Sequence, residues 1–173
     1  MTDVTMRRFP FDWGRLNSVE LEIVNNIIGV PMRQPDFVLA PENVPYLYRW
    51  YIVKERQANV YLHIQVANDW RVPHDHPWDN QSVYLTDGAI ETQFWPNGQI
   101  ERVDIRHRGD VVSRKATTLH RLDLQGGHDH AITLFTTGPK VREWGFLADD
   151  GWHHNRELID DQHGFSLGKK LHV

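Results

Sequence analysis

Hydrophobic residues near the N-terminus recur with the spacing of one amphipathic helix. Val19, Ile23 and Ile27 follow one another every four residues, which predicts a helix with these three side chains on one face. Asn17 can cap its first turn, and Glu20 stands three residues later, as a capping box requires. A glycine and a proline follow the pattern directly, so we expect one helix of about three turns.

The chain beyond this helix has the sequence pattern of short β-strands. Residues 31–45 contain four prolines and predict an extended arm. In residues 60–66 aliphatic side chains alternate strictly with Tyr61, His63 and Gln65, which is typical of a strand. Further strands are expected at residues 46–53, 81–86, 90–95, 99–105, 110–113, 118–124, 131–136 and 141–146. Short strands without intervening helices favour an antiparallel sandwich or barrel.

Composition narrows the classes of protein. With 173 residues, 40% of them hydrophobic, the chain suits about one globular domain. A formal net charge of −4 argues against a nucleic-acid-binding surface. No apolar run could span a membrane, and the first residues lack the apolar core of a secretory signal. The chain contains no cysteine, which excludes disulfides and thiolate ligands. We therefore expect a cytoplasmic protein that binds neither nucleic acid nor membrane.

Two histidines in one short segment are the first candidate for chemistry. His74 and His76 are two residues apart, so on an extended chain their side chains point to the same face and can share one metal ion. Alone, such a pair can equally be two solvated loop residues. A distant second element strengthens the metal interpretation, because Gly109 and Asp110 open a segment that ends at His120.

Together these two elements resemble the two motifs of the cupin superfamily. In the first motif, three or four residues separate the histidine pair from a glutamate, and six more separate that glutamate from a glycine. In this chain four residues lie between His76 and Gln81, which takes the place of the glutamate, and six lie between Gln81 and Gly88. The resemblance covers residues 46–147. It implies an all-β fold, the jelly-roll-like barrel called a double-stranded β-helix, with a metal ion inside. The chain also resembles a narrower group of bacterial and phage cupins with segments similar to HDHPWD (residues 74–79) and TGPKVREWGF (residues 137–146).

This resemblance divides the chain into three parts. Residues 1–45 are expected to form the helix and an arm packed on the outside of the barrel, residues 46–147 the cupin barrel, and residues 148–173 a polar tail. Many cupins dimerise by exchanging N-terminal strands, so a homodimer built through the arm is a further expectation.

The implied metal ligands are His74, His76 and His120, with Gln81 as a fourth. An amide in place of the usual carboxylate leaves a neutral ligand set, which suits a transition metal better than Mg²⁺. We expect Fe(II), with Ni, Zn, Mn or Cu as alternatives, and we expect a glutamate at position 81 to tighten binding. Asp79 could supply a carboxylate instead, although strand alternation puts it on the opposite face. A barrel without metal is the third possibility.

Four residues are candidates for contacting a substrate. Trp78 and Asp79 adjoin the histidine pair, and His63 would do so if its strand face lines the barrel mouth. Arg114 stands six residues before His120, on the same side by alternation, where its guanidinium could hold a carboxylate or phosphate. Ordinary core or surface roles are the alternative for each.

The resemblance implies a metal-dependent protein acting on a small, anionic molecule. A three-His, non-haem Fe(II) dioxygenase is the first expectation. The alternatives are a metal-dependent isomerase or lyase, and a cupin that binds a small molecule without catalysis, since one fold hosts many activities.

Overall fold

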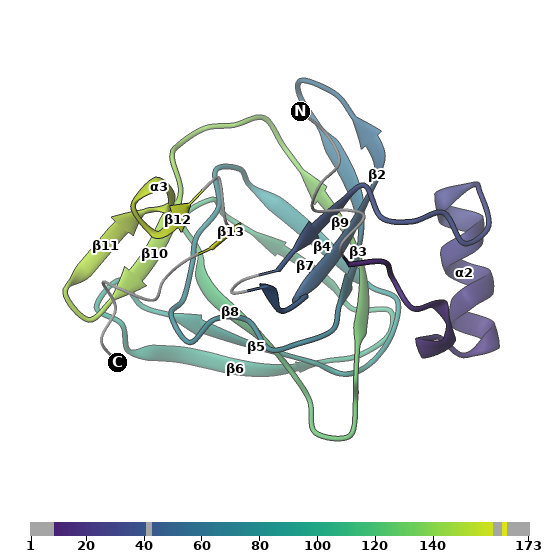
Figure 1. Ribbon diagram of the computed structural model, residues 1–173. Coiled ribbons are helices and arrows are strands. Elements are labelled where there is room, and N and C mark those ends of the chain that lie inside the picture. The colour runs from purple at the N-terminus through teal and green to yellow at the C-terminus, as the bar shows by residue number, and fades with distance from the viewer. Residues whose placement is uncertain (1–8, 41–42, 161–163, 166–173) are drawn as a thin grey trace.

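Eight antiparallel strands build the barrel that dominates the fold (Figure 1). The computed structural model describes residues 9–40, 43–160 and 164–165. The barrel strands are β2 (Leu47–Lys54), β3 (Asn59–Gln65), β4 (Asn80–Tyr84), β5 (Ala89–Phe94), β6 (Ile100–Arg106), β7 (Val111–Arg114), β8 (Leu119–Leu124) and β9 (Ala131–Thr137). Their bounds lie close to the segments expected from the alternation of hydrophobic residues.

The strands form two main sheets with non-sequential order. One sheet has the order β1-β2-β3-β9-β4-β7, with β1 spanning Phe37–Leu39, and the other has the order β6-β5-β8. All neighbouring strands are antiparallel. This arrangement is the double-stranded β-helix of the jelly-roll class, which confirms the expected all-β barrel.

A short 3-10 helix, η1 (Trp13–Arg15), and the helix α2 (Ser18–Ile28) precede the barrel. The capping box is present, since Asn17 accepts from the backbone of Glu20 and the Glu20 carboxylate accepts from the backbone of Asn17. The buried stripe differs from the expected one. Val24 and Ile28 are buried, whereas Val19 is 54% exposed. The predicted stripe of Val19, Ile23 and Ile27 lies beside a second apolar stripe that contains Val24 and Ile28. The second stripe is the one that packs most closely on the sheet. No helix in the described part of the chain is long and apolar enough to cross a membrane.

The largest hydrophobic core lies outside the barrel, between α2 and the sheet. Trp50 of β2 and Leu62 and Ile64 of β3 are fully buried there against Val24. The opposite face of β3, which carries His63, turns toward the barrel interior. The aliphatic side of this strand therefore anchors the helix, and its polar and aromatic side is left to line the interior.

The arm and the tail contain more regular structure than expected. Within the arm, β1 pairs with β2 of the same chain. Beyond the barrel, β10 (Gly145–Ala148) and β11 (Gly151–His154) form a hairpin, followed by α3 (Asn155–Leu158), β12 (Ile159–Asp160) and β13 (Gly164–Phe165). In Figure 1 this hairpin and α2 lie on opposite sides of the barrel. The expected strand at 141–146 begins only at residue 145, because the backbone of Val141 bonds to Pro77 and holds the preceding loop elsewhere. Residues 166–173 of the expected tail lie outside the described part.

Candidate metal centre

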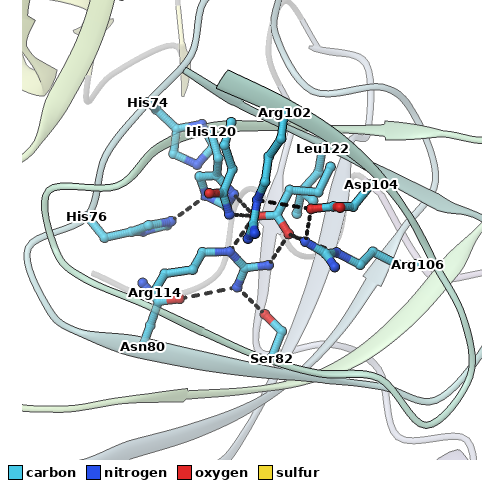
Figure 2. A network of polar contacts seen from close by, with 12 residues as sticks. His74, His76, Asn80, Ser82, Arg102, Asp104, Arg106, Arg114, His120 and Leu122 are labelled. Atoms are coloured by element: carbon cyan, nitrogen blue, oxygen red, sulfur yellow. Dashed lines mark hydrogen bonds and ion pairs between the residues drawn. The ribbon is translucent and has the colours of Figure 1, made fainter. Parts of the chain in front are cut away.

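Three histidines converge inside the barrel. His74 and His76 lie just before β4, and His120 lies on β8. Reciprocal backbone hydrogen bonds of 3.0 Å join His74 to His120 and fix the two segments side by side. One ring nitrogen from each of the three residues lies within 4.8 Å of those of the other two. Figure 2 shows His76 pointing at His120, and their Nε2 atoms are 2.8 Å apart. The structure thus brings together the three histidines predicted from the sequence.

Two of these histidines are held by carboxylates on their other nitrogen. Nδ1 of His120 lies 3.0 Å from Oε1 of Glu91, and Nδ1 of His74 lies 3.2 Å from Oδ2 of Asp69. An ionised carboxylate accepts a hydrogen bond, so each Nδ1 carries a proton, and Nε2 is the ring atom left to face a metal ion. Carboxylates placed in this way orient histidines that bind metals in proteins.

Burial keeps two of the imidazoles neutral. The pKa of His76 lies well below its usual value because of burial and because His120 and His74 are close to it. Burial also lowers the pKa of His120 to about 4, although Glu91 opposes this shift. Neutral imidazole is the form that binds a metal ion. These two imidazoles are therefore in the metal-binding form at neutral pH.

The spacing of the nitrogens fits one transition-metal ion. Two nitrogens bound at about 2.1 Å and at an angle of about 90° lie about 3.0 Å apart, close to the observed 2.8 Å between His76 and His120. Three neutral nitrogen ligands favour Fe, Ni, Cu or Zn over Mg²⁺.

A buried ion network lies behind His120. The Glu91 carboxylate is completely buried and forms ion pairs with Arg114 and Arg106. Arg114 uses Nε and Nη2 for Glu91, and its Nη1 bonds to the hydroxyl of Ser82. Figure 2 shows Arg114 directed into this network. Arg114 faces the interior as predicted from alternation, but its hydrogen bonds are committed to Glu91. It therefore supports His120 and is not free to bind a substrate anion.

Two other predicted site residues lie on the outside of the barrel. Gln81 is exposed and bonds to Ser113 of the neighbouring strand, so it is not placed to act as a fourth ligand. Asn80 and Ser82 take the inward positions on either side of it. Asp79 is half exposed, and its carboxylate binds Lys115 and the backbone of Ala116. Asp79 therefore fastens two loops together and contacts neither the histidines nor the interior.

The histidines face a cavity of about 420 Å³. This volume is in the usual range for small-molecule sites, about 300–1,000 Å³. His63 and Trp78 both line it, as predicted. The ring of Trp78 stacks on His76 at 5.8 Å, and that of His63 stacks on Phe135 at 5.2 Å. A large part of the wall is aromatic, including Phe37, Trp70, Trp78, Phe135, Trp144 and Phe146.

Sequence reasoning missed the residues that hold the histidines in place. Asp69 precedes the first motif in an irregular segment, and Glu91 lies on a strand between the two motifs. Alternation along β5 puts Glu91 on the inward face, with buried Ala89 and Gln93 on the same side. A buried carboxylate at an inward strand position is the signal that could have indicated Glu91. Asp69 has no such local pattern.

Comparisons with known proteins agree with the fold. No protein-family model matches the chain, and no curated protein sequence matches it. Among solved structures, Fe(II) HppE is similar at 11% identity and a TM-score of 0.50, covering 72% of this chain and 77% of that chain. A cupin superfamily protein from Desulfitobacterium hafniense is 12% identical, with a TM-score of 0.45 over 54% of this chain and 78% of that chain.

A third similar structure is a protein from Klebsiella pneumoniae subsp. pneumoniae with a double-stranded β-helix domain. It is 15% identical, with a TM-score of 0.46 over 58% of this chain and 84% of that chain. Identities this low speak for the fold alone. The chain has a double-stranded β-helix fold.

Proposed function

We propose that this protein is a metal-dependent enzyme that oxidises a small anionic molecule, using Fe(II) held by His74, His76 and His120. The observation that carries the proposal is the convergence of these three histidines on one cavity, with carboxylates on the second nitrogen of two of them. Histidines with a purely structural role do not need this arrangement of carboxylates and converging ring nitrogens.

Each part of the site has a defined task in this proposal. Asp69 and Glu91 fix the orientation and protonation of His74 and His120. The aromatic wall around Trp78 excludes water and binds the apolar part of a substrate. When bound, non-haem Fe(II) supplies the one-electron chemistry with O₂ that amino-acid side chains lack. Three neutral ligands leave the charge of the ion uncompensated, which favours an anionic substrate.

The cavity offers few side chains that are free to act as a base, which favours oxidation over isomerisation or lyase chemistry. Both alternatives need a side chain that removes a proton from the substrate. Among the described residues that line the cavity, Asp69 is the only carboxylate, and it is bonded to His74. His63 also lines the cavity, but its Nε2 accepts a hydrogen bond from Arg49. The polar groups near the metal centre are thus already engaged in holding other residues.

Metal analysis combined with O₂ consumption tests the proposal. The protein is purified without an affinity tag and under anaerobic conditions, loaded with Fe(II), and its metal content is measured. O₂ uptake is then followed with thiols, diketones and amino acids. We expect one bound Fe per chain and uptake that depends on the organic substrate. Bound metal without O₂ uptake, but with turnover of a substrate, selects the isomerase or lyase. Bound metal with ligand binding and no turnover selects a binding protein, and absence of metal after loading contradicts all three.

A further inference from the structure

Arg49 is a cation directed into the cavity on the side of β2 that faces the interior. Its Nε donates a hydrogen bond of 2.8 Å to Nε2 of His63, Tyr51 also hydrogen-bonds to its side chain, and Tyr46 and Tyr61 are further polar neighbours. The guanidinium carbon lies 4.7 Å from the centre of the Tyr61 ring and 5.8 Å from that of Phe37. These contacts hold the guanidinium against an aromatic surface, and its five N–H groups are more than His63 and Tyr51 take up.

Arg49 differs from the other buried arginines in having no carboxylate partner among the described residues. Arg114 and Arg106 share Glu91, and Arg142 pairs with Asp75. Burial lowers the pKa of Arg49, which reflects the cost of keeping its charge away from water. Such a charge is normally retained only when another group compensates it. An anion from outside the chain would do so.

The guanidinium and the metal centre share one wall of the cavity. The Phe135 ring stacks on His63 at 5.2 Å and lies 5.7 Å from the ring of His76. His63 in turn contacts Arg49, and His76 contacts His120. Phe135 therefore separates a cationic end from a metal-binding end, with an apolar surface between them.

We propose that Arg49 binds the carboxylate of the substrate, whose apolar or aromatic body lies along Phe135 and whose reactive end lies at the three histidines. Carboxylate is favoured over phosphate because Arg49 is the only arginine or lysine among the described residues lining the cavity, so it offers one full positive charge. A guanidinium also matches the two oxygens of a carboxylate. His63 is then a positioning residue that orients Arg49. This inference rests on the proposed function for the identity of the reactive end only.

Binding of small aromatic probes to the metal-free protein tests this assignment separately from the metal site. The probes are benzoate, neutral benzamide and phenylphosphonate, measured by isothermal titration calorimetry in the presence of a chelator. The variants are Arg49→Met, Arg49→Lys and, as a control with the same loss of charge, Arg56→Met in the exposed turn after β2. Circular dichroism establishes that each variant is folded.

We expect wild-type protein and Arg56→Met to bind benzoate alike, and both to prefer it to benzamide and phenylphosphonate. Arg49→Met should bind benzoate about ten- to a hundredfold more weakly, the usual effect of losing a charged hydrogen-bond partner. The benzoate affinity of Arg49→Lys should lie between those of the wild type and Arg49→Met, because lysine keeps the charge but lacks the paired donors.

Benzoate affinity unchanged in both Arg49 variants, or equal affinity for benzamide, would overturn the anion site. Tighter binding of phenylphosphonate would overturn the choice of carboxylate. If Arg49→Met does not fold, Arg49→Lys alone decides, since unchanged benzoate affinity in it contradicts the paired-donor geometry. None of these results depends on bound metal, so the proposed function can fail while this site stands, and the reverse.

Discussion

Asp75 is buried and forms a partly exposed ion pair with Arg142, which joins the two segments that resemble the narrower cupin group. The same carboxylate accepts hydrogen bonds from the backbone of Gly145 at 2.7 Å and from Nε1 of Trp152 at 3.0 Å. Gly145 approaches the next strand so closely that a Cβ there would lie 1.9 Å from the backbone oxygen of His153. The residue between His74 and His76 is thus fastened to the β10–β11 hairpin.

Replacing Asp75 by asparagine should destabilise the protein through this junction. The Asp75→Asn side chain keeps its size but leaves Arg142 without a charged partner, and we expect a loss of about 1–3 kcal/mol in the free energy of unfolding. Urea unfolding measures this loss. Glu143→Gln is the matched control, because the Glu143 ion pair with Lys140 is half exposed and should contribute less than about 1 kcal/mol. Equal losses in the two variants would argue against the junction.

A second prediction concerns the buried carboxylate behind His120. Glu91 is completely buried and is the shared counter-ion of Arg114 and Arg106. The substitution Glu91→Gln removes this negative charge. Breaking a buried ion pair from one side costs about 3–5 kcal/mol, and chemical denaturation should show a loss of this size. Asp104→Asn makes the same chemical change at a partly exposed partner of Arg106 and should cost less than about 1 kcal/mol. A small effect of Glu91→Gln would mean that the network does not stabilise the fold.

Acid should destabilise the metal-free protein through its buried histidines. Burial and the charge of Arg49 hold the pKa of His63 well below its usual value. Between that lowered pKa and about 6.5 the unfolded chain binds a proton that the folded chain does not, so stability is present above about pH 6.5 and is lost as the pH falls. Each such histidine contributes a slope of up to about 1.4 kcal/mol per pH unit.

The variant His63→Gln keeps a hydrogen-bond acceptor for Arg49 but cannot be protonated. Its free energy of unfolding, measured in chelator between pH 7 and pH 5, should depend on pH less steeply than that of the wild type by about 1.4 kcal/mol per unit. The variant His107→Gln, at an exposed histidine, controls for the loss of a histidine as such. An unchanged slope in His63→Gln would show that His63 is not buried in its neutral form.

Local pattern was sufficient to predict the strands, but it did not identify which face of a strand meets the cavity. Alternation along β3 separates Leu62 and Ile64 from Tyr61 and His63, and both faces turn out to be buried. The aliphatic face packs against α2, which the spacing of one strand cannot reveal because the helix comes from a distant part of the chain. The position of the helix decides that His63 faces the interior.

The same limit explains which site residues were predicted correctly. The histidines follow from motif spacing, which fixes positions on neighbouring strands. Gln81 was assigned by spacing alone, and a difference of one residue in a strand reverses the face, so the inward neighbour is Asn80 instead. Asp69 contacts His74, five residues away, and Glu91 contacts His120, 29 residues away. Such contacts follow from the folded barrel and not from local sequence pattern.

The outward position of Gln81 reverses one expectation from the sequence. A carboxylate there was expected to complete the ligand set, but the side chain bonds to Ser113 on the outside of the barrel. Gln81→Glu should therefore leave the Kd for Fe(II) or Zn(II) unchanged within about twofold, because an exposed charge is screened by solvent and cannot reach the ion. Competition with a metal-binding dye measures the Kd. Tightening by tenfold or more would show that residue 81 turns inward when metal binds.

The most demanding prediction concerns His120, because it tests the link between two distant segments. His74 and His76 are neighbours and could hold an ion on any exposed strand, whereas His120 reaches them only in the closed barrel. The His120→Ala chain should still fold, since Glu91 keeps its ion pairs with Arg114 and Arg106.

The variant should nevertheless lose its metal, because two remaining imidazoles bind a divalent ion far more weakly than three. Metal content is measured by elemental analysis after equal loading of wild type, His120→Ala and the control His107→Ala, whose histidine is exposed. Added metal should raise the melting temperature of the wild type and of His107→Ala but not that of His120→Ala, since a ligand stabilises the folded state only where it binds. Equal metal content in His120→Ala and the wild type would separate His120 from the site and would contradict a three-histidine centre in this barrel.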